Sequence, residues 1–371
     1  MALGKYKTKY PGIDIKIIPS SMTSLNSLKM AVVAGNGPDV ISMDHVYATS
    51  LGTEGIFADL APYGATNVKN LFTKSCYDAN CVGDKVYALP WSANVVNLMY
   101  SKELFNQAGL SNAPNNYTEF LDTCKKLKNK GYKAFSFPYG GPGSNKNWSA
   151  FMFFTWLWRE GGDILTTDSN GKSIAAFNGT AGVNALTKLV ELYKQGYMDV
   201  SYTEDLGSNG TAMMQMGTWK IDLVSGVNAT KNGVAVVPTL VDGVAPYSGL
   251  GLYSYCVSAK AQDTQAAYNF VELLCTDEDL QVRYNKKVFI TPLISAQSNS
   301  SYTTGTDAEA WKVFFEQLKY SKFRPGIPGW EDIEKSVSDG VYAAIKGNSG
   351  VQEALDAAAN VVNSNLKRIY G

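Results

Sequence analysis

The sequence is poor in the residues that acid–base and metal chemistry use most often. It has a single histidine, His45, which argues against a His-ligated metal site and against His-based catalysis. Its five cysteines form no C-x-x-C pair and no zinc spacing. Lys plus Arg and Asp plus Glu each number 33, so no net positive field favours nucleic acid. We therefore expect no metal, no cofactor and no nucleic-acid partner.

Long apolar runs are also missing. The longest aromatic-rich run, residues 151–158, is much shorter than the roughly 18 apolar residues of a membrane-spanning helix. No signal peptide precedes Ala2, and the chain opens directly in a predicted helix over residues 2–10. We expect that sequence upstream of this helix was removed.

The cysteines leave two interpretations open. Cys76 and Cys81 are close enough in sequence to form a disulfide across a small loop. The alternative is that all five are buried thiols, and the odd number guarantees at least one unpaired thiol. The five are Cys76, Cys81, Cys124, Cys256 and Cys275.

The chain is rich in apolar and aromatic residues. With 371 residues, of which 45% are hydrophobic and 18% charged, it is long enough for two globular domains with their own cores. Tyrosines number 22 and tryptophans 7, more than a charge-driven binding site would need. A neutral ligand that binds to flat aromatic surfaces is therefore consistent with the composition.

Hydrophobic periodicity predicts an α/β fold. Pro11-Gly12 ends the first helix, and the alternating isoleucines of residues 13–17 predict a strand. A helical pattern over residues 25–33 and a short buried strand over 39–42 follow, which is the order of a βαβ unit. Asn116 and Glu119 predict a capping box. Further strands are expected at 85–89, 95–100, 134–137, 234–237 and 253–257, and further helices at 120–127, 183–193, 266–274, 311–318, 333–345 and 351–366.

An ordered series of short motifs runs along nearly the whole chain. It resembles the series found in family 1 extracellular solute-binding proteins, the group that includes maltose-binding protein. The resemblance rests on order and coverage rather than on one pattern. The motifs are Tyr10-Pro11-Gly12-Ile13-Asp14-Ile15, Ala34-Gly35-Asn36-Gly37-Pro38-Asp39-Val40, Gly83-Asp84-Lys85-Val86-Tyr87-Ala88-Leu89-Pro90, Leu98-Met99-Tyr100-Ser101-Lys102-Glu103-Leu104-Phe105 through Ala108-Gly109-Leu110, Tyr117-Thr118-Glu119-Phe120, Gly161-Gly162, the stretch from Gly210 to Trp219, Ala266-Ala267-Tyr268-Asn269-Phe270-Val271, and Pro325-Gly326-Ile327-Pro328 through Trp330.

The resemblance implies a two-lobed, type II periplasmic-binding-protein fold. Each lobe would be a mixed, mostly parallel sheet flanked by helices, with a helix-rich C-terminus. Lobe 1 would comprise 1–93 and 246–292, and lobe 2 would comprise 94–245 and 293–371, with hinge crossings near 92–96, 238–249 and 292–298. Family members also begin with an apolar strand before the first helix. That strand is absent here, so its slot in lobe 1 would be empty.

The resemblance also implies a function. The chain would be the extracytoplasmic receptor of a bacterial ABC importer, which binds a sugar in the cleft between its lobes and delivers it to the permease subunits. It would be a monomer without catalytic activity, at the cell surface or in the periplasm, and attached to the membrane only through a lipid anchor outside this sequence. A receptor for another solute (polyamine, peptide or iron) and a carbohydrate-active enzyme are the alternatives.

A sugar needs flat rings for its C–H faces and short polar groups for its hydroxyls, which selects the candidate residues. The resemblance places Trp219 on the sugar, and Tyr253 after Gly251, whose missing side chain would permit close backbone approach. Asp44 and Tyr47 follow a strand at its carboxyl end, where ligands of open α/β sheets bind. The remaining candidates are Trp91, Asn147, Trp148 and Trp330.

Each candidate has a structural alternative. Trp219 could be a core residue, strand alternation could bury Tyr253, and Asp44 could be a helix N-cap. His45 is expected to be structural. Trp156, Trp158 and Trp311 lie on apolar helix faces and are expected in the core.

Overall fold

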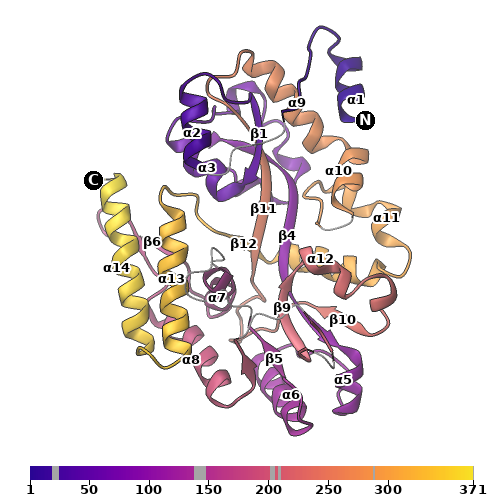
Figure 1. The fold of residues 1–371 in the computed structure, drawn as a ribbon, viewed down its shortest axis with the longest axis vertical. Helices are drawn as coiled ribbons and strands as arrows, with labels where there is room; N and C mark the ends of the chain where they lie inside the picture. Colours follow the sequence, from indigo (N-terminus) through magenta and orange to yellow (C-terminus); the bar gives the residue numbers. More distant parts are fainter. Residues whose placement is uncertain (19–24, 138–147, 201–204, 208–209, 287–288, 371) are drawn as a thin grey trace. The chain divides into compact units, whose positions relative to one another are not determined.

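The chain divides into two compact units in the computed structural model (Figure 1). The structure describes residues 1–18, 25–137, 148–200, 205–207, 210–286 and 289–370. Unit 1 comprises Met1–Asn94, Gly251–Tyr302 and Phe323–Pro328, and unit 2 comprises Val95–Leu250, Thr303–Lys322 and Gly329–Gly371. The family resemblance defined its two lobes by the hinge crossings between them, and the bounds of these lobes stay a prediction.

Unit 1 is a mixed α/β unit. It is built mainly from its N-terminal part, and the chain returns to it twice. Its helices are α1 (Ala2–Lys9), α2 (Leu25–Val33), α3 (His45–Thr53), α4 (Lys74–Asp78), α9 (Thr264–Thr276), α10 (Glu278–Asn285) and α11 (Ser300–Thr303), with short 3₁₀ turns at Ala61–Tyr63, Lys69–Leu71 and Ser295–Ser298. Its strands are β1 (Val40–Asp44), β2 (Cys81–Val82), β3 (Lys85–Val86), and the unit 1 parts of β4 (Ala88–Ser101) and β11 (Ser248–Val257).

The predicted first helix forms, but the predicted strand after it does not. Helix α1 lies against α9 through Tyr6, whose hydroxyl donates to the carbonyl of Ala266 at 2.8 Å (Figure 1). Residues 13–18 adopt no regular element, so the strand predicted over 13–17 is wrong. A strand is held by a ladder of hydrogen bonds to a neighbour, and no described strand pairs with this segment. Ile17 and Ile18 are therefore largely exposed.

The sheet of unit 1 has an apolar inner face. Strand β1 pairs antiparallel with β11, its one strand partner among the described residues. Met43 and Cys256 point to the inner side and pack with Leu28 and Val32 of α2 and Leu51 of α3. Because side chains alternate along a strand, Ser42 and Asp44 of β1 and Tyr253 and Tyr255 of β11 lie on the opposite, outer face.

Unit 2 contains most of the predicted helices. They are α5 (Lys102–Gln107), α6 (Tyr117–Asn129), α7 (Trp148–Arg159), α8 (Thr180–Lys194), α12 (Ala308–Lys319), α13 (Trp330–Ile345) and α14 (Val351–Tyr370), with 3₁₀ turns at Thr218–Leu223 and Gly226–Asn228. Its strands are the rest of β4 and β11, with β5 (Phe135–Ser136), β6 (Leu165–Thr167), β7 (Ser173–Ala175), β8 (Met198–Asp199), β9 (Met213–Gly217) and β10 (Asn232–Ala235); β12 (Ser321–Phe323) runs across the boundary.

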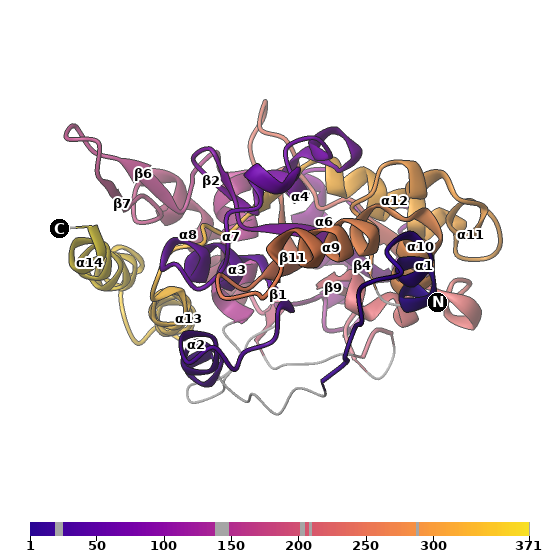
Figure 2. The ribbon, with the colours of Figure 1, turned by 90° about the horizontal axis from the view of Figure 1, so that it is seen from above.

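The sheet of unit 2 is mixed. Strand β9 pairs antiparallel with β4 and parallel with β5, which in turn pairs parallel with β8. The N-cap of α6 forms as predicted, because the Asn116 side chain accepts the backbone N–H of Glu119 at 3.0 Å. Figure 2 shows the β6–β7 hairpin extending beside α14, with which β7 packs. The α/β fold class predicted from periodicity is confirmed.

The aromatic run of residues 151–158 is the centre of the unit 2 core. These side chains belong to α7, which packs against α8 and α13, while α13 and α14 lie side by side (Figure 1). Trp156 and Trp158 are buried, and so is Trp311 of α12, which confirms the interpretation of all three as core residues. Within the described ranges, no helix combines the length and apolar character needed to cross a bilayer.

All five cysteines are free thiols, so Cys76 and Cys81 do not form the disulfide that their spacing allowed. Burial raises the pKa of the Cys76 thiol to about 12, and of Cys81 to about 11. Both therefore stay protonated and poorly nucleophilic at neutral pH.

Candidate functional site

The outer face of the unit 1 sheet carries aromatic and polar side chains. The strand register places Ser42 opposite Tyr255 and Asp44 opposite Tyr253. Trp91 of β4 joins them, because its indole N–H donates to the Ser42 hydroxyl at 2.8 Å. We call this set, Ser42, Asp44, Trp91, Tyr253 and Tyr255, the aromatic face.

The rings of the aromatic face support one another. The Trp91 ring centroid lies 5.6 Å from that of Tyr255 and 6.4 Å from that of Tyr253, with tilts of 31° and 35°. Phe289 meets Tyr253 edge-on at 5.8 Å. Tyr255 also packs against the apolar cluster of α1, α9 and α10, which covers its far side. Tyr253 is 41% exposed and Ser42 is exposed as well, so the accessible part of the face lies at these two residues.

Asp44 lies at the carboxyl end of β1 and is the N-cap of α3, as its structural alternative predicted. One carboxylate oxygen, Oδ1, accepts the backbone N–H of Val46 at 3.1 Å and lies 3.0 Å from Nδ1 of His45. The other, Oδ2, pairs with Nη2 of Arg324 at 2.7 Å. Burial alone would raise the pKa of Asp44. The Arg324 charge and the nearby His45 outweigh that effect, so the pKa of Asp44 lies well below its ordinary value. Asp44 is therefore ionised at neutral pH.

Tyr253 stays neutral at the same place. Burial, and next the charge of Asp44, raise the pKa of its hydroxyl, while Arg324 opposes the shift. A protonated phenol can donate and accept a hydrogen bond, and its ring offers a flat apolar surface. Carboxylate, hydroxyls and rings on one face form the combination that a sugar requires.

Two further predicted residues of unit 1, Tyr47 and Gly251, have packing contacts. Tyr47 is half-buried against the inner core cluster of unit 1. Asn94 occupies the space beside Gly251, because a Cβ built on Gly251 would lie 2.3 Å from Oδ1 of Asn94. The space that the missing side chain of Gly251 leaves open is thus filled by the Asn94 side chain. Whether either residue also touches a ligand stays a prediction.

We expect Gly251→Ala to lower the free energy of unfolding by about 1–3 kcal/mol, because an added methyl in a packed site forces its neighbours to move. Asn94 is buried and would have to shift. Chemical denaturation measures the change. Gly4→Ala is the control, since nothing lies within 4 Å of its added Cβ. Equal stability of the wild type and Gly251→Ala would show that Asn94 does not restrict this position.

Trp219 of unit 2 lies directly after β9 and folds back over it. A Cβ built on Gly217 would be 1.8 Å from Cζ3 of the Trp219 ring, so the ring lies on the bare backbone of that glycine. The residue is half-buried, which leaves part of its ring accessible. This arrangement suits a stacking platform and explains why a glycine precedes Trp219 at this spacing. Ligand contact at Trp219 stays a prediction.

The structure places Trp330 differently. Its side chain is only 2% exposed at the start of α13, and its ring lies 6.2 Å from that of Phe154 in α7. It therefore packs two helices of unit 2 together, and the predicted ligand contact would need its edge to become accessible. Asn147 and the side chain of Trp148 lie outside the described residues.

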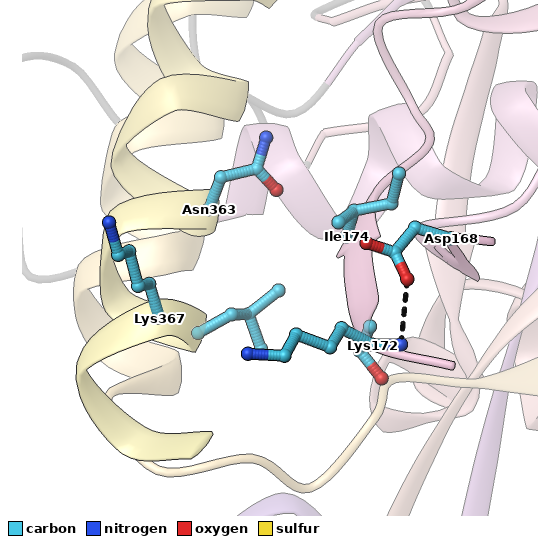
Figure 3. Close-up of a pocket in the computed structure, with 7 residues that line it drawn as sticks. Asp168, Lys172, Ile174, Asn363 and Lys367 are labelled. Atoms are coloured by element: carbon cyan, nitrogen blue, oxygen red, sulfur yellow. Dashed lines mark hydrogen bonds between the residues drawn. The ribbon is translucent and has the colours of Figure 1, made fainter. Parts of the chain in front are cut away.

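A surface pocket of about 280 Å³ in unit 2 does not coincide with the predicted site (Figure 3). It lies between the β6–β7 hairpin and α14, where Ile174 and Leu366 supply its apolar lining. The side chain of Asp168 accepts the backbone N–H of Lys172 at 2.9 Å, so this carboxylate closes the hairpin turn. No aromatic ring lines the pocket, which makes it a poor match for a sugar.

Sequence reasoning missed three residues of the aromatic face and its surroundings. Ser42 and Tyr255 lie two positions from Asp44 and Tyr253, so the period-two alternation of a strand could have identified both. Arg324 is 280 residues from Asp44 in sequence, and no local pattern connects them.

Comparisons with known proteins identify the family. A family model described as bacterial extracellular solute-binding protein matches residues 1–280. A galactooligosaccharide-binding protein of Bacillus subtilis (strain 168) is 24% identical over 370 residues, which covers 96% of this chain and 83% of that protein. A maltooligosaccharide ABC transporter solute-binding lipoprotein of Streptococcus pneumoniae is 22% identical over 389 residues, which covers 100% of this chain and 86% of that protein.

Solved structures share the fold. The cyclic alpha-maltosyl-1,6-maltose binding protein from Arthrobacter globiformis has a TM-score of 0.85 at 24% identity, with 99% of this chain and 94% of that chain covered. The sugar-binding protein MalE from Xanthomonas citri has a TM-score of 0.82 at 21% identity, with 99% and 93% covered. Because the family model matches most of the chain, this protein belongs to the bacterial extracellular solute-binding proteins.

Proposed function

We propose that this chain is the sugar-binding receptor of a bacterial ABC importer and that its ligand is an oligosaccharide. The observation that carries the proposal is the aromatic face, where Trp91 and Tyr253 lie beside the ionised Asp44. Rings suit the C–H faces of a sugar, and a carboxylate suits its hydroxyls. Relatives that bind galactooligosaccharides and maltooligosaccharides support this ligand class.

The proposal includes a mechanism. The sugar would contact Trp219 of unit 2 as well as the aromatic face of unit 1, and so would shift the population from an open to a closed form. Only contacts that are better in the closed form drive such a shift. The permease subunits would recognise the closed form, and the receptor itself would break no bond. Small-angle scattering should show a smaller radius of gyration with saturating sugar, and an unchanged radius would contradict closure.

A thermal-shift screen tests the ligand class. The panel contains galactotriose, maltotriose, glucose, spermidine, a tripeptide and ferric citrate. A ligand at 100 times its Kd adds about 2.7 kcal/mol to the stability of the folded state. We therefore expect at least one oligosaccharide to raise the Tm by a few degrees and the last three compounds to leave it unchanged. A shift with spermidine, peptide or iron alone would favour a receptor for another solute, and cleavage of the oligosaccharide would favour an enzyme.

A further inference from the structure

Asp44 has few free positions for a ligand. A carboxylate has about four lone-pair positions. Val46 and Arg324 already occupy two of them, at 3.1 and 2.7 Å, and Nδ1 of His45 lies 3.0 Å from Oδ1. The Asp44 side chain is still 27% exposed, and it lies opposite the accessible Tyr253. The structure therefore leaves room for a ligand hydroxyl at Asp44 beside its protein partners, but for fewer hydroxyls than an unpaired carboxylate could accept.

Arg324 belongs to a short segment that α3 holds in place. The segment is Phe323–Pro328, the last return of the chain to unit 1. The Phe323 ring meets the His45 ring edge-on at 6.3 Å. A Cβ on Gly326 would lie 1.6 Å from Oγ1 of Thr49, so only a glycine permits this packing. Contacts on both sides of Arg324 thus fix its backbone, and its side chain is 11% exposed.

The Arg324–Asp44 pair has no net charge. Arginine is protonated at all ordinary pH values, and its charge offsets that of the carboxylate. Among the described residues, the imidazole of His45 on α3 and the neutral phenol of Tyr253 on β11 also face Asp44. A cationic ligand would therefore gain little from Asp44, because the nearest cation is already in place. An uncharged hydroxyl can still donate to the oriented oxygen.

We propose that Arg324 is a positioning and specificity-determining residue, which orients Asp44 as an acceptor for a ligand hydroxyl and makes the site selective for uncharged ligands. The inference rests on the proposed function, because it requires that Asp44 contacts the sugar.

The test compares Arg324→Gln, Arg324→Lys and Lys322→Gln with the wild type by titration calorimetry against maltotriose and galactotriose. Lys322 is the matched control, because it lies two residues upstream and pairs with Asp163 at 3.1 Å. Arg324→Gln should weaken oligosaccharide binding roughly 30-fold, as is typical when a buried charge pair loses one partner. Arg324→Lys keeps the charge and should recover part of the affinity, and Lys322→Gln should bind like the wild type.

A pH profile separates positioning from a merely structural role. Between about pH 5 and pH 8 Asp44 stays ionised in the wild type, so titration of Asp44 itself should not change the wild-type affinity. In Arg324→Gln, burial is no longer opposed by the arginine charge, so the pKa of Asp44 rises and affinity should fall as the pH drops toward about 5. Spermidine should bind the wild type not at all and Arg324→Gln measurably.

Three results decide the matter. If the wild type binds neither oligosaccharide, the proposed function fails and the inference fails with it. If the wild type binds one of them and Arg324→Gln binds equally well with a flat pH profile, the inference alone is wrong. Spermidine binding to the wild type would also overturn it. If Arg324→Gln does not fold, Arg324→Lys is used alone. It keeps the positive charge, and an affinity equal to that of the wild type would then count against a positioning role of the arginine.

Discussion

Trp219→Ala should lose oligosaccharide binding while the protein stays folded. Buried aromatic anchors contribute about 2–4 kcal/mol to binding, so the Kd should rise roughly 30- to 700-fold. The ring is only half-buried and lies on Gly217, so its removal leaves no closed cavity in the core. Calorimetry measures the affinity, and denaturant unfolding should show a small change in stability. Trp219→Phe keeps a flat ring and should lose much less.

Gly217→Ala tests the same platform without touching the ring itself. The backbone of Gly217 has φ −90° and ψ 173°, which alanine adopts without strain. The added methyl would nevertheless lie 1.8 Å from Cζ3 of Trp219, so the ring must move. We expect the affinity to fall about tenfold or more. Wild-type affinity in both Trp219→Ala and Gly217→Ala would remove Trp219 from the site.

Trp330→Ala should have the opposite profile, with a large loss of stability. The side chain is buried between α13 and α7, and truncation of a core tryptophan costs about 3–5 kcal/mol because a cavity remains. Its indole N–H has no hydrogen-bond partner among the described residues. Trp330→Phe removes this polar atom and keeps most of the packing, so it should cost less than alanine.

Affinity separates the two interpretations of Trp330. Trp330→Phe should unfold at a lower denaturant concentration than the wild type and bind the oligosaccharide with the same Kd. A stable Trp330→Phe variant with much weaker binding would instead support the ligand contact that the sequence motif suggested.

Local patterns predicted most of the helices because the determinants of a helix lie close together in sequence. Asn116 caps α6 as its spacing with Glu119 indicated. The four-residue steps from Ile333 to Ile345 produced the buried side of α13. Such features need no knowledge of the rest of the chain, because backbone hydrogen bonds within a helix join residues four apart.

Strands and site residues depend on distant partners, and there the sequence was less informative. The isoleucines of residues 13–17 have the pattern of a strand, but no described strand pairs with them. Trp219 and Trp330 both follow a glycine within a family motif, yet one ring lies half-exposed and the other is buried. Trp330 is buried because α13 packs against α7, and this contact between distant segments cannot be seen in the motif.

The same limit applies to Asp44. The sequence suggested a ligand carboxylate or a helix N-cap, and the structure shows the N-cap together with an ion pair to Arg324. The partner comes from the far end of the chain, so the charge of the site could not be derived from the residues around Asp44. An ion pair changes what a carboxylate can bind, because its negative charge is already compensated.

Binding of an uncharged oligosaccharide to the aromatic face can be measured by titration calorimetry of the Trp91→Ala, Tyr253→Ala and wild-type proteins with galactotriose and maltotriose. We expect one-to-one binding of at least one of these sugars to the wild type, and a Kd at least about tenfold higher in each variant. If neither sugar binds the wild type, or if both variants bind with unchanged affinity, the aromatic face is not the sugar-binding site.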